Sequence, residues 1–250
     1  MTQTPEASPT PEESRDDRPE LAAHDHGAPT LAEDLMLALF QPGSGTIAGE
    51  NTLFYVLGGA VVTELALGEH VRADDDGAGG PRVGAVVGHP PSDPLLRSAW
   101  DYVAEKPRSV QTVLAAIGPR LREPVLDRLV ERGEIRREHG KALGLFPTTS
   151  LTEGDTGRRA ELVASVREVL VDGAEPTPRV AALTALISGS GTLPQFHREI
   201  PWSSPVIARA KELEQGNWGA AGAAEAVTRT MTAIIVNNVI IAAAVLPRNG

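Results

Sequence analysis

The chain has 250 residues, no cysteine and a formal net charge of −10. This length suits one sizeable domain or two small ones, and the lack of cysteine excludes disulfides and thiolate chemistry and fits a reducing cytosol. The charge disfavours a general attraction to nucleic acid or anionic lipid, so binding either one requires a local basic patch.

Residues 1–29 are rich in proline, glutamate and aspartate and contain no apolar run. Because such a composition cannot support a packed core, we expect a disordered acidic tail before a domain at 30–250. The same composition argues against a signal or transit peptide. His24 and His26 lack the further converging ligands of a metal site, so we expect no metal and no cofactor.

The domain is predicted to open with a short helix from Leu31, in which leucines recur every four residues. Glu33 and Asp34 suit its first turn, where acidic side chains favour the helix dipole. A second helix is expected to end near Gly68. Residues 70–88 then predict a two-stranded hairpin around an acidic, glycine-rich turn.

The second half of the chain is also predicted to be mostly helical. A helix capped by Ser92 or Asp93 precedes the helical segments at 109–118 and 121–133, and a hairpin at 134–149 is expected to turn at His139 and Gly140. Further helices are expected within 158–173, 177–191, 201–217 and 231–246. The fold class is therefore mainly α: a buried central helical bundle surrounded by shorter helices, with one or two β-hairpins.

The uncharged stretch at 231–246 could be mistaken for a membrane span. A span needs about 20 predominantly apolar residues, and Asn237 and Asn238 would place costly amides in its middle. We therefore interpret it as a helix at the centre of a globular bundle.

Motifs of catalysis are missing from the sequence. There is no nucleophile elbow, zinc-protease helix or paired-carboxylate motif. GSGT occurs at 43–46 and 189–192, but neither copy has the lysine and preceding strand of a phosphate-binding loop. The sequence predicts a non-enzymatic protein.

Residues 109–149 are predicted to run helix, turn, helix, hairpin, which is the order of a DNA-binding winged helix. Basic residues gather on the second helix and the hairpin: Arg120, Arg122, Arg128, Arg132, Arg136, Arg137 and Lys141. Acidic residues interleave with them, so a solvated helix face with i,i+4 ion pairs is the alternative interpretation. A nucleic-acid-binding regulator is our second hypothesis, and a pure protein-interaction scaffold is the third.

The second half of the hairpin is apolar. Leu143 and Leu145 are predicted to face one way, with Ala142 and Phe146 on the other face. One face would pack on the domain, and the other would serve oligomerisation or shallow insertion into a bilayer. A hairpin packed wholly on its own core is the alternative.

Several segments, in order, resemble the Golgi phosphoprotein 3 family and its bacterial relatives. They are LAEDLMLALF, LGGAVVTELALGEHV, SDPLLRSAWDYV, LDRLVERGEIRRE followed by LGLFPTT, TPRVAALTALI and the apolar last helix. The resemblance covers residues 30–246 and implies a mainly helical fold around a buried bundle. Eukaryotic members of that family bind phosphatidylinositol 4-phosphate, insert or pair through the β-hairpin, and hold glycosyltransferase tails for coat-dependent retrieval; of these properties, the coat function is not expected to transfer to this chain.

Part of the family's head-group pocket maps onto this sequence. One of its two paired arginines falls on Arg122, and the other falls on Pro119, with Arg120 as a neighbouring substitute. The family's helix arginine falls on Gly58, and its tryptophan falls near Gly49. The basic arm that recruits coat is replaced here by the acidic tail.

The resemblance therefore implies a non-enzymatic, cytoplasmic adaptor at the inner face of a membrane. Arg122, helped by Arg120, is expected to bind an anionic head group through charge-assisted hydrogen bonds. Leu143, Leu145 and Phe146 are expected to contact membrane, a protein partner or a second copy of the chain. No transmembrane span is expected.

Overall fold

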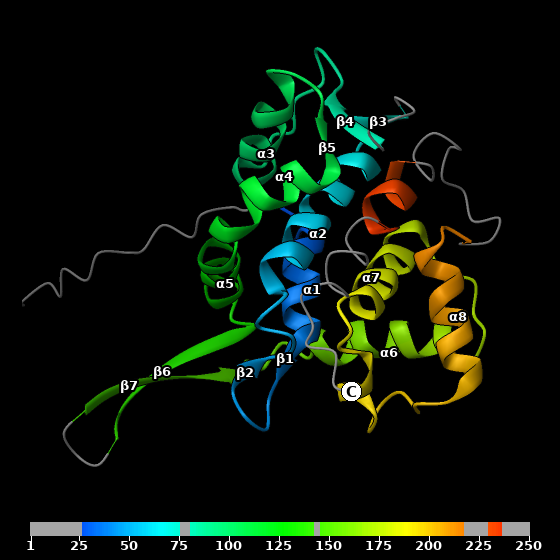
Figure 1. Cartoon of the computed structure of the whole chain (residues 1–250). Helices are drawn as coiled ribbons and strands as arrows, with labels where there is room; N and C mark the ends of the chain where they lie inside the picture. The colour runs from blue at the N-terminus through cyan, green and yellow to red at the C-terminus, as the bar shows by residue number, and fades with distance from the viewer. Residues whose placement is uncertain (1–26, 76–80, 143–145, 218–229, 237–250) are drawn as a thin grey trace, which may run out of the picture.

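The computed structural model describes residues 27–75, 81–142, 146–217 and 230–236 (Figure 1). Its helices are α1 (Leu31–Leu39), α2 (Leu53–Leu67), α3 (Pro94–Ala104), α4 (Val110–Ile117), η1 (Gly118–Arg120), α5 (Arg122–Glu131), α6 (Arg158–Leu170), α7 (Pro178–Gly189), η2 (Leu193–Phe196) and α8 (Ser204–Glu214). Its strands are β1 (Phe40–Gln41), β2 (Thr46–Ile47), β3 (Val71–Asp75), β4 (Pro81–Ala85), β5 (Arg108–Ser109), β6 (Ile135–Ala142) and β7 (Phe146–Glu153). The predicted mainly α fold class is confirmed.

Helices α1 and α2 lie side by side at the centre of the fold (Figure 1). Every residue of α1 is buried, as is most of α2. Helices α3 and α4 pack on α2 and α5 packs on α1, while α6 and α7 cover α1 from the other side. The predicted central bundle is confirmed, because a helix that is apolar all round must be enclosed by others.

Residues 230–236 form the described part of the last predicted helix. Met231, Ile234 and Ile235 are fully buried, and the Ala73 amide donates a hydrogen bond to the Thr230 hydroxyl. This part of the stretch therefore belongs to the core. In the ranges that the structure describes, no helix is long and apolar enough to cross a membrane. Asn237 and Asn238 lie outside those ranges.

Strands β6 and β7 form one antiparallel hairpin that extends away from the helices (Figure 1). The turn that the sequence predicted at His139 and Gly140 is wrong, because both residues pair within the ladder, with Thr149 and Thr148. The fully buried Ile135 anchors the register at the base of the hairpin, and a buried face fixes strand register more strongly than a short turn signal does.

Ala142 and Phe146 form the last described pair of this ladder. Phe146 begins β7 and pairs with Ala142, so it does not share a strand with Ala142 as the sequence predicted. The connection runs through 143–145, and Leu143 and Leu145 lie outside the described residues. Their predicted contact with membrane or partner stays a prediction.

Candidate functional site

A cavity of about 610 Å³ lies between the start of α5, the hairpin and the β1–β2 turn. We call it the Arg122 cavity. Its volume falls within the range of pockets that hold small molecules. Its charged lining residues are Glu50, Arg122, Glu123 and Arg137, and its hydrogen-bonding side chains are Thr46, His139 and Thr149.

The wall opposite α5 depends on a close approach of two backbones. Gly45, in the β1–β2 turn, has a φ of +68°, a conformation that side chains disfavour. A Cβ atom at Gly45 would lie 2.5 Å from the Leu151 carbonyl oxygen. The glycine thus lets the turn rest directly against β7, so that Thr46 from the turn and Thr149 from β7 both line the cavity.

The arginines of the Arg122 cavity are held by nearby carboxylates. Arg122 donates to Glu50 Oε1 at 2.6 Å and to Glu123 Oε1 at 2.5 Å. Arg137 pairs with Asp127 at 2.7 Å and with Glu123 at 3.3 Å. The pKa of the Arg122 guanidinium is raised, chiefly because of its hydrogen bond to Glu50.

These ion pairs can be exchanged at small cost. The side chains that form them are between 30% and 64% exposed. Solvent-exposed pairs contribute only about 0–1 kcal/mol each to stability. In the structure Glu50 and Glu123 each accept from a different nitrogen of Arg122, whereas one phosphate can accept both bonds as a bidentate pair, so an anionic ligand could displace both carboxylates without disturbing the fold.

Arg120 does not join Arg122. It is the last residue of η1, it is exposed, and it lines a separate cavity between α3, α4 and α5. The two arginines that the sequence grouped into one head-group site therefore face different cavities.

The other positions of the family pocket are closed by packing. Gly58 is buried in α2, and a Cβ atom there would lie 3.3 Å from the Leu114 side chain. Gly49 has a φ of +71°, and its Cβ atom would lie 2.6 Å from the Thr192 γ-methyl group. Neither glycine lines the Arg122 cavity, and a large side chain at either position would force its neighbours apart.

Arg137 is a lining residue that the sequence did not assign to this site. The hairpin ladder places it two residues before His139, so both point to one face of the hairpin. Both line the Arg122 cavity with Arg122. Side chains two residues apart in a strand face the same way, so the sequence could have grouped Arg137 with His139. That inference required knowing that His139 lies within strand β6 rather than in the turn.

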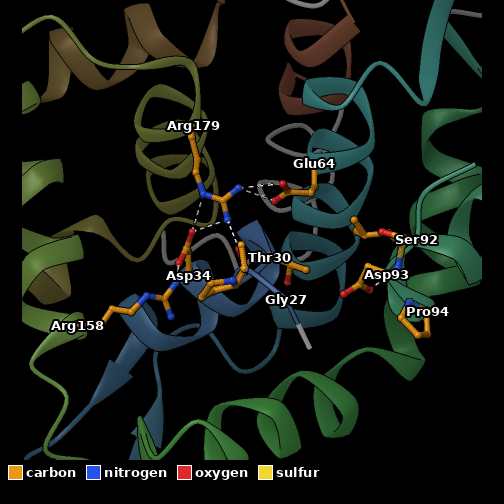
Figure 2. Close-up of a pocket in the computed structure, with 12 residues that line it drawn as sticks. Gly27, Thr30, Asp34, Glu64, Ser92, Asp93, Pro94, Arg158 and Arg179 are labelled. Atoms are coloured by element: carbon orange, nitrogen blue, oxygen red, sulfur yellow. Dashed lines mark hydrogen bonds and ion pairs between the residues drawn. The ribbon is translucent and has the colours of Figure 1, made fainter. Parts of the chain in front are cut away.

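A polar cavity of about 880 Å³ lies at the start of α1 (Figure 2). Arg179 donates to both oxygens of Glu64, at 2.9 and 2.8 Å, and also bonds Asp34 and the Pro29 carbonyl oxygen. Arg158 pairs with Asp34 and with Glu134. These charges are already satisfied by one another, so we interpret the cavity as part of the scaffold.

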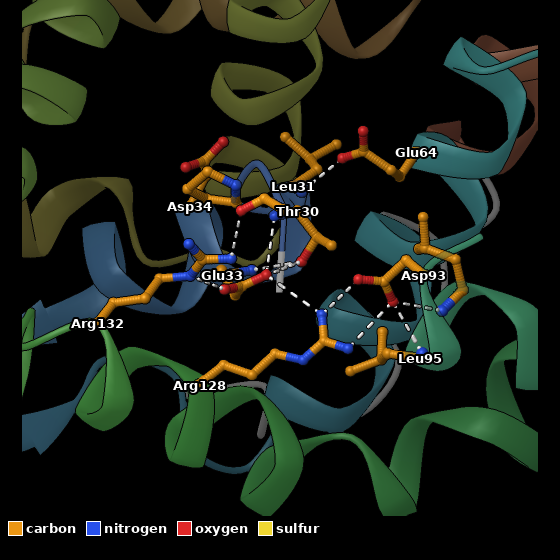
Figure 3. A network of polar contacts seen from close by, with 12 residues as sticks. Thr30, Leu31, Glu33, Asp34, Glu64, Asp93, Leu95, Arg128 and Arg132 are labelled. Atoms are coloured by element: carbon orange, nitrogen blue, oxygen red, sulfur yellow. Dashed lines mark hydrogen bonds and ion pairs between the residues drawn. The ribbon is translucent and has the colours of Figure 1, made fainter. Parts of the chain in front are cut away.

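A related network joins α5 to the core (Figure 3). Arg128 donates to both oxygens of Asp93, at 2.7 and 3.1 Å, and Arg132 Nε donates to Glu33 Oε1 at 2.8 Å. Burial alone would raise the pKa of Asp93, but hydrogen bonds from Arg128 and from the Leu96 and Leu95 amides outweigh it and the pKa is lowered.

This network corrects the sequence interpretation of α5. Arg128 was expected either on a DNA-reading helix or on a solvated face with i,i+4 pairs. Its side chain is only 8% exposed, and its partners come from outside α5. Arg132 likewise turns inward to Glu33. Two of the arginines that suggested nucleic-acid binding are thus engaged in ion pairs within the protein and do not present their charge to a nucleic acid.

In the part of the chain that the structure describes, no group of three or more histidine, aspartate or glutamate side chains is placed to hold a metal ion. His24 and His26, discussed above as weak metal candidates, lie outside that part.

Comparison with known proteins identifies the fold's relatives. Among curated proteins, none matches this sequence. The family model described as Golgi phosphoprotein 3 (GPP34) matches residues 31–230, from the first residue of α1 to the start of the last described helix. The match takes in the central bundle, the Arg122 cavity and the hairpin, and the chain belongs to the Golgi phosphoprotein 3 family.

Proposed function

We propose that this protein is a non-enzymatic peripheral-membrane adaptor that binds an anionic lipid head group, of the phosphatidylinositol 4-phosphate type, in the Arg122 cavity. Family membership supports an adaptor role in contact with lipid and protein. The observation that carries the site assignment is a half-exposed arginine at a family binding position, facing a cavity lined by a second arginine and by hydroxyl groups.

Binding would proceed by exchange of partners. The phosphate oxygens take the place of the Glu50 and Glu123 carboxylates on Arg122, and Arg137 supplies the second cation. Thr46 and Thr149 offer hydroxyl donors from the facing wall. Because the cavity's own carboxylates balance its arginines, we expect affinity to come from short-range hydrogen bonds rather than from long-range attraction.

The hairpin would supply the second part of membrane attachment. A single phosphate contact gives only weak binding, so apolar contact or avidity through self-association must add to it. Phe146 pairs with Ala142 in the last described pair of the hairpin, which extends away from the helices (Figure 1), and Leu143 and Leu145 are close to it in sequence. They would enter the bilayer surface or pair with a second copy, at the inner face of the membrane.

Vesicle co-sedimentation tests the proposal. Neutral vesicles, generic anionic vesicles and vesicles with phosphatidylinositol 4-phosphate would be compared, with the expectation of selective pelleting by the phosphoinositide. Arg122→Ala should lower that binding about tenfold or more, since a hydrogen bond to a charged group contributes about 1.5–3 kcal/mol. Phe146→Asp should weaken vesicle binding while leaving binding of the soluble head group unchanged.

Arg167→Ala is the matched control. Arg167 pairs with Asp172 at 2.6 Å with 44% and 49% of the two side chains exposed, close to the values of the Arg122–Glu50 pair. The substitution removes the same charge from a residue that does not line the Arg122 cavity. Equal loss in both variants would mean nonspecific electrostatics, and no pelleting with any vesicle would remove the lipid role.

A further inference from the structure

The cavity that Arg120 lines has a volume of about 530 Å³ and lies between three helices. We call it the α3–α5 cavity. Its walls are apolar: Leu95 and Ala99 come from α3, Ile117 from the end of α4, and Leu121 and Pro124 from the start of α5. An apolar cavity of this size, open to the surface, is typical of a site for a small hydrophobic group.

Two arginines are the only charged side chains in this lining. Arg128 is already bound by both oxygens of Asp93. Arg120 is exposed, and the described residues offer it no carboxylate partner. In a chain with a net charge of −10, an unpaired guanidinium beside an apolar cavity is an attractive point for a single negative group.

We propose that the α3–α5 cavity binds a single-chain amphiphile with an anionic end group. The alkyl chain lies between α3, α4 and α5, and the carboxylate or phosphate bonds Arg120. This site is distinct from the Arg122 cavity, and the proposal does not depend on phosphoinositide binding.

The lining favours an alkyl chain over a peptide. A peptide carries a donor and an acceptor at nearly every residue, and burying such a backbone group without a partner is strongly unfavourable. Apart from the engaged Arg128, the polar side chains that line the walls are Ser98, Tyr102 and Arg120. These few groups suit one polar end group, whereas methylene groups need no partner.

The volume limits the chain length. At roughly 30 Å³ for each non-hydrogen atom, taken from the share of a water molecule in the liquid, the cavity holds about 18 such atoms. With the cavity open to the surface, this sets an upper limit of about sixteen carbons for a carboxylate and about thirteen for an alkyl phosphate. Each buried methylene contributes about 0.8 kcal/mol, so affinity should rise about fourfold per carbon and then level off at or before that length.

Isothermal titration with soluble amphiphiles tests the proposal on the full-length protein. The probes are alkyl carboxylates from hexanoate to tetradecanoate and decyl phosphate, each below its micelle concentration, with decanol and decylamine as uncharged and cationic controls. Arg120→Ala should weaken decanoate binding about tenfold to a hundredfold. Ala116→Phe, from the half-buried α4 position in the lining, should abolish it. Unfolding curves confirm that each variant is folded.

The outcomes separate the possibilities. Binding that favours anions, depends on chain length and requires Arg120 supports the site. If the alkyl carboxylates bind and decyl phosphate does not, the natural ligand is a free fatty acid rather than a phosphate-bearing lysolipid. Equal binding of decanol, no effect of Arg120→Ala, or no binding of any probe would overturn the proposal. Arg122→Ala should leave this binding intact, so loss there would also contradict two separate sites.

Discussion

Arg122 and Arg128 lie on the same helix but meet solvent to different degrees. The Arg122 side chain is 39% exposed and that of Arg128 is 8% exposed. An exposed ion pair contributes little to stability, whereas removing one partner of a buried pair leaves a charge that water cannot reach. The same residue type is therefore free to exchange partners at one end of α5 and is fixed in the scaffold at the other.

Glu50 is expected to compete with the ligand for Arg122. Glu50→Gln removes the carboxylate that holds Arg122 Nε, so phosphate binding should strengthen by up to about fivefold, the equivalent of an exposed ion pair. Vesicle binding at fixed phosphoinositide content measures the change. Asp172→Asn, which releases Arg167 in the same way, should have no effect. Weaker binding in Glu50→Gln would show that Glu50 positions Arg122 for the ligand.

Asp93 makes the stability of α3 sensitive to acid. Its pKa in the folded state lies below that of the unfolded chain, so its contribution is fully present above about pH 4 and is lost as pH falls through the folded-state value. Asn in its place still caps α3 but removes the two short bonds that Arg128 makes to the carboxylate, and leaves it only the longer pair to Glu33, at 3.6 Å. Urea unfolding should show Asp93→Asn destabilised by about 3 kcal/mol at pH 7, and less at pH 3. A constant difference would contradict this role.

At the scale of elements, α5 is positioned by the contact between η1 and α2. Gly118 lies so close to α2 that a Cβ atom would be 2.3 Å from the Phe54 carbonyl oxygen. Because that neighbour is backbone, it cannot move aside as a flexible side chain can. The glycine therefore fixes where α5 begins, and with it the placement of Arg122.

Gly118→Ala should separate η1 from α2. We expect a loss of about 1–3 kcal/mol in the free energy of unfolding, as for other overpacked sites, together with weaker phosphoinositide binding. Denaturant unfolding and vesicle binding measure the two effects. Gly43→Ala is the control, because a Cβ atom there would meet nothing within 4 Å. Wild-type stability in Gly118→Ala would mean that the η1–α2 contact can adjust.

The elements differ in how far the sequence predicted them. The helices α1 to α8 were predicted near their observed bounds, and the predicted cap Asp93 is the N-cap of α3, whereas the short helices η1 and η2 were not predicted. The two-residue strands β1, β2 and β5 were missed, since two residues show no alternation. The β6–β7 turn was predicted in the wrong place because the His139-Gly140 pair is typical of a turn. In the structure, the buried Ile135 sets a register in which both residues pair within the ladder.

For the whole molecule, the family and the bundle could be predicted, but the ion-pair networks could not. Glu33 and Asp34 were expected to serve the helix dipole, yet they receive arginines from positions about 100 residues or more away in sequence. A single sequence carries no signal for such pairing. Arg122 was assigned through the resemblance to the family's motif and stays a proposed site residue, while its separation from Arg120 could be seen only from the two cavities.

Charge at the scale of the whole chain should modulate membrane binding. Residues 1–26 carry seven acidic and two basic residues, which is half of the net charge of −10. Removing them should strengthen binding to anionic vesicles at low salt and have little effect near physiological salt, where the Debye length is about 8 Å. Co-sedimentation across a salt series measures this. A gain that persists at high salt would point instead to direct occlusion by the tail.

Glu33 links two helices that are far apart in sequence. Its carboxylate accepts from the Thr30 amide and hydroxyl, which closes the capping box of α1, and it also receives Arg132 from the end of α5. If α5 detaches, a fully buried carboxylate loses its cation, and the first turn of α1 loses its stability with it. Helices α1 and α5 should therefore open as one cooperative unit, and their amide hydrogens should share the same protection against exchange.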